Sequence, residues 1–114
     1  MLKDDRVRLQ HMLDAVLEVI EFTRNKQRSD LDTDRKLKHA LVRLLEIIGE
    51  AAAGISSDIK QECPGIPWKE MIGMRNRLIH GYFDVDLDIV WQTISKDIPP
   101  LKPLLEQEMN ENSH

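Results

Sequence analysis

The sequence predicts an all-α protein, an up-and-down bundle of four to five helices. Apolar residues recur at helical spacing in several long segments, and no segment shows the polar–apolar alternation of a strand. The 5 glycines and 5 prolines of the 114 residues are clustered, which leaves room for long helices. With 41% apolar residues, the chain predicts a single domain over residues 1–114, with a disordered tail from about residue 109 to 114.

Two long helices are expected in the first half. The first runs from Asp4 to about Asn25, with an apolar stripe widened by Met12 and Val19 and made of Leu9, Leu13, Val16 and Ile20. After a polar connection, Asp32 or Thr33 would cap the second helix. Its broad stripe comprises Leu37, Leu41, Leu44, Ile48, Ala51 and Ile55. The small residues between Gly49 and Gly54 would let another helix approach closely.

Shorter helices are expected in the second half. Ser56 or Ser57 would cap a short helix that ends before Pro64. Pro67 suits the first position of a helix that runs to about His80, because a proline there lacks only an N–H that would be unpaired anyway.

The last long helix is expected after residue 86. Asp84 or Asp86 would cap it, and Gly81 would end the helix before it. Its apolar contacts would be Leu87, Val90, Trp91, Ile94 and Ile98, and it would be kinked or restarted by Pro99, Pro100 and Pro103.

Composition excludes several classes of function. The net charge of −4 argues against a protein coated with basic surface for nucleic acid, although a local basic pocket remains compatible with it. No run approaches the about 18 apolar residues of a membrane span, and the N-terminus lacks the apolar region of a signal peptide, so a cytoplasmic protein without membrane contact is expected. Cys63 is the only cysteine, and His11, His39 and His114 have no partners at metal-ligand spacing, so neither a disulfide nor a metal site is expected.

The segment MRNRLIHGYFDVD, Met74–Asp86, concentrates the residues that can carry chemistry. It places two arginines, an asparagine, a histidine and the only tyrosine between Arg75 and Tyr82. Cleavage of RNA by attack of its 2′-hydroxyl needs a group that exchanges protons near neutral pH, which suits His80. It also needs a cation for the charge that develops on the phosphate, which suits Arg75.

Helix geometry restricts how these groups can meet. Positions 75 and 80 lie about 140° apart on an ideal helix, so Arg75 and His80 would not converge within one straight segment. Either Gly81 loosens the helix end, or the two residues meet across a twofold axis between two chains. Glu46 and Glu50 share one face of the preceding long helix, where they would form a solvated edge or contact an arginine of the motif.

Beyond the motif, the segments IIGEAA, PGIPW, IVWQTI and IPPLKPLL extend a resemblance over nearly the whole chain. The chain resembles the HepT-like toxins of the HEPN-domain family. The resemblance implies a HEPN fold, a homodimer with the motif helix at its interface, and a metal-independent endoribonuclease without a cofactor that acts as a toxin. It makes Arg75 and His80 the catalytic pair on an RNA substrate, with Asn76 in support and Arg77 available for RNA phosphate.

The resemblance also assigns a role to Tyr82. In pairs of the HepT/MntA type, a partner nucleotidyltransferase antitoxin attaches AMP to the tyrosine of the motif and silences the toxin. A bulky anionic nucleotide there would fill the site and pair with its arginines. The alternative for Tyr82 is a ring that packs at the edge of the bundle. Two other functions stay open for the chain: a non-catalytic module that docks a nucleotidyltransferase and presents RNA or a nucleotide, or a dimeric adaptor with a structural motif.

Overall fold

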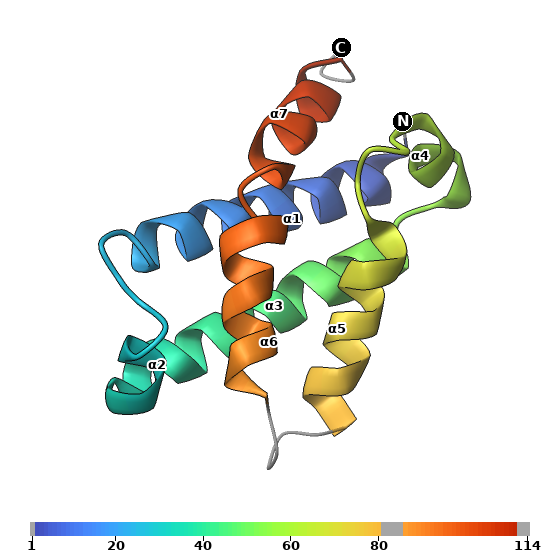
Figure 1. Cartoon of the computed structure of the whole chain (residues 1–114). Helices are drawn as coiled ribbons and strands as arrows, with labels where there is room; N and C mark the ends of the chain where they lie inside the picture. Colours follow the sequence, from blue (N-terminus) through green and yellow to red (C-terminus); the bar gives the residue numbers. More distant parts are fainter. Residues whose placement is uncertain (1, 81–85, 112–114) are drawn as a thin grey trace.

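Two long antiparallel helices, α1 (Lys3–Phe22) and α3 (Arg35–Gly54), pack side by side along their length (Figure 1). The computed structural model describes residues 2–80 and 86–111, with the side chains of Ile79 and His80 outside that description. Between the two helices, Asn25 takes a positive φ of 62°, which asparagine tolerates well, and a single turn of helix, α2 (Asp30–Thr33), follows.

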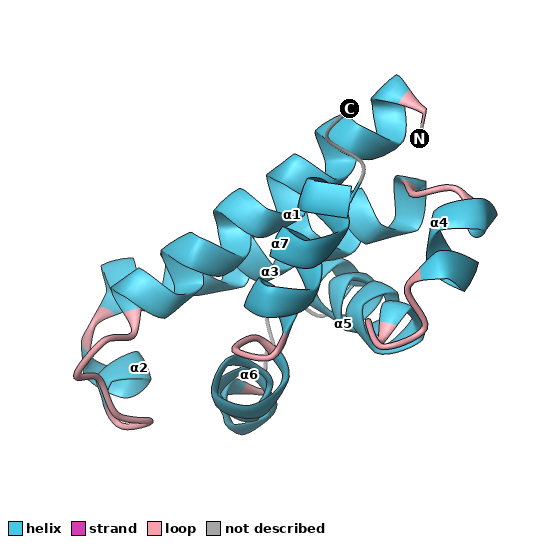
Figure 2. Ribbon diagram, turned by 90° about the horizontal axis from the view of Figure 1, so that it is seen from above, coloured by secondary structure: helices cyan, strands magenta, loops and turns pink. Residues whose placement is uncertain are grey.

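A second pair of helices crosses the first at a steep angle (Figures 1 and 2). After the short α4 (Ser57–Glu62), α5 (Trp68–His80) packs on α3, and α6 (Leu87–Gln92) runs antiparallel to α5. A π-helical turn, η1 (Thr93–Asp97), continues α6, and α7 (Leu101–Glu111) packs back against α1. The residues that the structure describes contain no strand, so the all-α prediction is confirmed.

The core forms around α3, as its apolar stripe predicts. All six stripe residues from Leu37 to Ile55 are buried. On α1 the buried face is rotated from the predicted one: Met12 and Val19 are fully buried, while Leu13 and Ile20 are only partly covered. This face of α1 contacts two helices, because both α3 and α7 pack against α1.

Several predicted helix ends differ from the structure. The cap of α3 is Asp34, whose carboxylate accepts from Leu37 N–H at 3.0 Å, and not Asp32 or Thr33, because those residues belong to α2. Ser56 caps α4 as expected, whereas α5 begins at Trp68, one residue after Pro67.

The C-terminal helices also differ in detail from the expected one. The single expected helix after residue 86 is divided into α6, η1 and α7. α7 continues to Glu111, past the point near residue 109 where a disordered tail was expected, because Met109 is buried in the core; residues 112–114 lie outside the described residues. Within the described ranges, no helix is both long enough and apolar enough to cross a membrane.

A buried carboxylate joins the start of α1 to the end of α3. Asp5 is 3% exposed and accepts hydrogen bonds from the Ser56 N–H at 2.8 Å and the Ser56 hydroxyl at 2.6 Å. Burial acts to raise the pKa of the Asp5 carboxyl, but the Ser56 bonds and the nearby Arg8 outweigh it, so this pKa lies below its ordinary value. The ionised form of Asp5 therefore stabilises the fold.

Replacement of Asp5 by alanine should lower the free energy of unfolding by about 1–3 kcal/mol at pH 7, because it leaves the Ser56 N–H without its acceptor. Since the pKa of Asp5 is lowered on folding, its contribution is fully present above the ordinary value of 3.8 and is lost as the pH falls through the folded-state pKa. Urea unfolding of wild type and Asp5→Ala as a function of pH should show the two stabilities converging in acid.

The matched control is Asp4→Ala, because Asp4 is exposed and makes no hydrogen bond or ion pair with any described residue. Loss of its charge in the first turn of α1 should lower the free energy of unfolding by less than about 1 kcal/mol. Equal losses in both variants would contradict the role given to Asp5.

Candidate functional site

The chemistry-bearing residues of the Met74–Asp86 segment begin on the C-terminal half of α5. The structure describes the side chains of Arg75, Asn76 and Arg77. For His80 it describes only a helical backbone position, and Tyr82 lies outside the described residues. The structure therefore brings Arg75 and Asn76 together and leaves the partners of His80 and Tyr82 as predictions.

Arg75 has hydrogen-bonding capacity that the described residues do not use. Its Nη1 donates to Asn76 Oδ1 at 2.7 Å, while its buried Nε has no hydrogen-bond partner among the described residues. No carboxylate in that part of the chain pairs with it either. A buried N–H without an acceptor is costly, and the positive charge of a guanidinium without a neighbouring carboxylate is not balanced. Arg75 is thus prepared to bind an anion or another acceptor.

The position of Arg75 depends on a glycine of α3. A Cβ atom at Gly49 would overlap the Cβ of Arg75 and would lie 2.8 Å from the carbonyl oxygen of Met71. The two helices therefore meet backbone to backbone at this point. The sequence predicted a close approach at the small residues between Gly49 and Gly54, but it did not identify Arg75 as the residue that fits there.

The carboxylates on the nearby face of α3 pair with another arginine. Arg43 Nη1 lies 3.2 Å from Glu46 Oε2 and 3.9 Å from Glu50 Oε1. No ion pair joins Glu46 or Glu50 to Arg75 in the described part of the chain. Of the two alternatives left open by the sequence, the structure favours the solvated edge.

Arg77 lies on a different side of α5, as its two-residue offset from Arg75 requires. It lines a cavity of about 260 Å³ between α5, α6 and η1. Its side chain forms no hydrogen bond or ion pair with any described residue. The two arginines consequently face separate parts of the surface.

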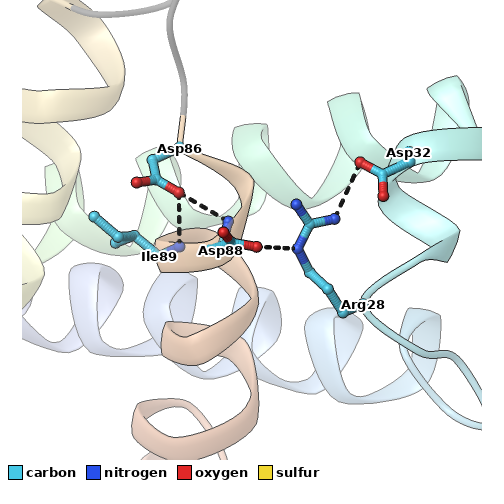
Figure 3. Close-up of polar contacts among 5 residues, drawn as sticks. All are labelled: Arg28, Asp32, Asp86, Asp88 and Ile89. Carbon is cyan, nitrogen blue, oxygen red and sulfur yellow. Dashed lines mark hydrogen bonds and ion pairs between the residues drawn. The ribbon is translucent and has the colours of Figure 1, made fainter.

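The start of α6 is fixed by a polar network of which the sequence predicted only the Asp86 cap (Figure 3). Asp86 caps the helix by accepting from the backbone N–H groups of Asp88 at 3.0 Å and Ile89 at 3.3 Å, as one of the two predicted caps. Arg28 Nε donates to Asp88 at 2.7 Å, and its Nη1 lies 3.1 Å from Asp32. Since Arg28 precedes Asp88 by 60 residues, nothing local in the sequence indicates this bond.

Thiol chemistry is disfavoured at the single cysteine. Burial raises the pKa of Cys63 to about 12, and its hydrogen bond to Glu108 at 3.0 Å acts in the same direction. Among the described residues, no group of three or more His, Cys, Asp or Glu side chains is arranged to hold a metal ion.

Comparisons with known proteins give one consistent family. The family model described as "Ribonuclease HepT-like" matches residues 12–108. The chain is 44% identical to "Probable ribonuclease HepT" of Thermococcus cleftensis, over 87% of this chain and 90% of that protein. It is 38% identical to "Putative RNase MJ1380" of Methanocaldococcus jannaschii, over 91% of this chain and 95% of that protein. No solved structure matches.

Substitution of Gly49 by alanine tests the contact that positions Arg75. Because the added methyl group meets the backbone of Met71 and the stem of Arg75, α5 must shift, and the free energy of unfolding should fall by about 1–3 kcal/mol. Urea unfolding measures the change.

Gly73→Ala is the matched control on α5, since a Cβ there meets nothing within 4 Å. This variant should be unchanged or more stable by up to about 1 kcal/mol, the helix preference of alanine over glycine. A Gly49→Ala protein as stable as the control would show that the helices are not held in contact here.

Proposed function

Because the chain belongs to the family of HepT-like ribonucleases, we propose that it is the toxin of a toxin–antitoxin pair and cleaves RNA without a metal ion. Arg75 and His80 carry the reaction, and Asn76 supports Arg75. The observation that supports this proposal best is the state of Arg75, which has a buried Nε without a partner and no carboxylate paired with it among the described residues. The Nη groups of such a guanidinium can donate to phosphate oxygens, and no neighbouring carboxylate balances its positive charge.

The proposed reaction is an intramolecular phosphoryl transfer within the RNA. The 2′-oxygen of a ribose attacks the adjacent phosphorus, the 2′-O–P bond forms, and the bond from phosphorus to the 5′-oxygen of the next nucleotide breaks. One group removes the proton of the 2′-hydroxyl and a proton returns to the departing 5′-oxygen. His80 serves in this proton exchange because its ordinary pKa lies near neutral pH. Arg75 stabilises the charge that builds on the phosphate oxygens, and Asn76 Oδ1, 2.7 Å from Nη1, holds the guanidinium in place.

The active form proposed is a homodimer in which two copies of the motif share one cleft. The backbone of α5 stays helical to His80, so positions 75 and 80 of one chain lie about 140° apart around its axis. A twofold axis beside α5 would set Arg75 of one chain against His80 of the other. RNA is the substrate, and the proposal includes neither DNA nor a membrane.

Regulation would act through Tyr82. A partner nucleotidyltransferase of the MntA type would transfer AMP from ATP to the tyrosine hydroxyl, forming a phosphodiester and releasing pyrophosphate. Tyr82 follows His80 by two residues, so the added phosphate and nucleotide would compete with RNA for the arginines of the motif.

Single variants at Arg75 and His80 should lose RNA cleavage in excess EDTA, while wild type retains it. Loss of a general acid–base group lowers rates by about 10²–10⁴-fold, and loss of a charge-stabilising donor by about 10²–10³-fold. If each site is shared between two chains, refolding a mixture of the Arg75→Ala protein and the His80→Ala protein should restore activity. One of the two sites in a mixed dimer then contains both native residues.

His39→Ala is the matched control, an exposed histidine on α3 whose Nε2 accepts a hydrogen bond from Arg35 Nε at 3.3 Å. It should cleave as wild type does. No cleavage by wild-type protein with Tyr82 unmodified by intact mass, across total cellular RNA, would contradict the ribonuclease proposal and favour the non-catalytic binding module.

Tyr82→Phe should separate regulation from catalysis. The variant lacks the hydroxyl that accepts AMP, so it should remain toxic and should no longer be silenced when the nucleotidyltransferase is co-expressed. Growth assays with intact-mass measurement of both proteins test this. A Tyr82→Phe protein that is still fully neutralised, with no AMP added, would count against modification and favour silencing by tight binding.

A further inference from the structure

The cavity beside Arg77 has the form of a ligand groove, which we call the α5–α6 groove. Its volume is about 260 Å³, and its floor is apolar, with Ile48, Met71 and Met74 among the floor residues. Drug-sized ligands occupy cavities of about 300–1,000 Å³, so this groove suits a single ring system. Methionine sulfur makes favourable contacts with aromatic rings, which makes such a floor suitable for a flat base.

The far wall of the groove is built by the π-helical turn. Gln92, Thr93, Asp97 and Ile98 all line it. In an α-helix, residues five apart such as Gln92 and Asp97 would diverge by about 140°. The Ile98 N–H instead bonds to the carbonyl oxygen of Thr93, five residues back, at 3.0 Å. This wider turn brings Gln92 and Asp97 to the side of the helix that faces the groove, together with Thr93 and Ile98. Turns of this kind are rare and occur frequently at functional sites.

The rim of the groove carries polar groups that the fold does not use. Glu70 and Arg77 stand on α5, and Gln92 and Asp97 stand opposite. All four are exposed, and none forms a hydrogen bond or ion pair with any described residue. The rim therefore offers one guanidinium, two acceptor-only carboxylates and one amide to a ligand.

We propose that the α5–α6 groove binds one nucleobase of the RNA substrate, with the phosphate of that nucleotide on Arg77. This inference rests on the proposed function and adds a base preference to it. The carboxylates of Glu70 and Asp97 accept hydrogen bonds and donate none, so they suit the exocyclic amino groups of adenine, cytosine and guanine. Uracil has no amino group and binds least well. Because positions 75 and 77 lie about 200° apart around α5, the bound base belongs to a nucleotide some way along the RNA from the cleaved bond.

Methionine methyl groups give a direct measurement. Of the 5 methionines, Met71 and Met74 lie in the groove, whereas Met12 is a fully buried residue of α1 and Met109 lies on α7. In ¹³C-methyl-methionine His80→Ala protein, AMP, CMP and GMP should shift the Met71 and Met74 signals and leave Met12 and Met109 unchanged, with UMP binding most weakly. No shift at Met71 and Met74 with any of the four nucleotides, or equal shifts at all four methionines, would overturn the proposal.

Variants at the end of α6 and on the π-helical turn supply the matched comparison. Gln92→Ala and Asp97→Ala should each weaken nucleotide binding about tenfold, the effect of one lost hydrogen bond in the groove. Lys96→Ala should bind as wild type does, because Lys96 is exposed on the same turn and does not line the groove. Equal binding by Asp97→Ala and Lys96→Ala would overturn the assignment of the rim.

The two proposals fail in different ways. If wild type cleaves RNA but nucleotides leave Met71 and Met74 unshifted, the groove proposal is wrong and the ribonuclease proposal stands. If nucleotides bind in the groove but wild type cleaves no RNA, the base site is retained and the catalytic assignment of Arg75 and His80 is wrong.

Discussion

The contact between Gly49 of α3 and Arg75 of α5 is the constraint on which the candidate site depends. Because no side chain separates the two helix backbones there, α5 lies directly on the most buried helix of the fold. The half-buried arginine is then held at its stem by packing and at its head by Asn76. A charged group that binds phosphate benefits from this arrangement, since a side chain fixed in advance loses less entropy when its ligand arrives.

The start of α6, which follows residues 81–85, is held by different interactions. Asp86 closes the first turn of α6, and Arg28 links that turn to α2 through Asp88 and Asp32. Residues 81–85 are therefore flanked by a helix packed on the core and by a helix start tied to the opposite end of α3. Arg28, Asp32 and Asp88 lie outside the Met74–Asp86 segment, so the position of this segment depends on residues beyond it.

Much of the fold could be predicted because its signals are local. The period of apolar residues located α1 and α3, Pro67 located the start of α5 to within one residue, and Ser56 and Asp86 are helix caps that the sequence identified. The α3 cap was assigned one or two residues early, because Asp32, Thr33 and Asp34 are adjacent and all are capable caps. An aspartate in a first helical turn normally faces water, so nothing indicated that Asp5 is buried against Ser56.

The candidate site, like the fold, could be predicted only where its signals are local in the sequence. Its residue types were evident from the motif, and the small residues of α3 predicted a close helix contact, but the partner at Gly49 depends on how α5 crosses α3. The groove beside Arg77 could not be predicted, because its lining residues come from α3, α5, α6 and η1, and one wall requires a π-helical turn. Such a turn has no sequence period of its own over 5 residues.

The π-helical turn has a consequence for comparing chain lengths among relatives. A bond from residue 98 to residue 93 spans one residue more than an α-helical bond, so the turn accommodates one extra residue between α6 and α7. A relative with a single-residue deletion here would continue α6 as a regular α-helix in the same direction, but without the wider turn that brings Gln92 and Asp97 to one side. A one-residue gap in an alignment at this point would thus separate proteins that keep the wall opposite Arg77 from those that have lost it.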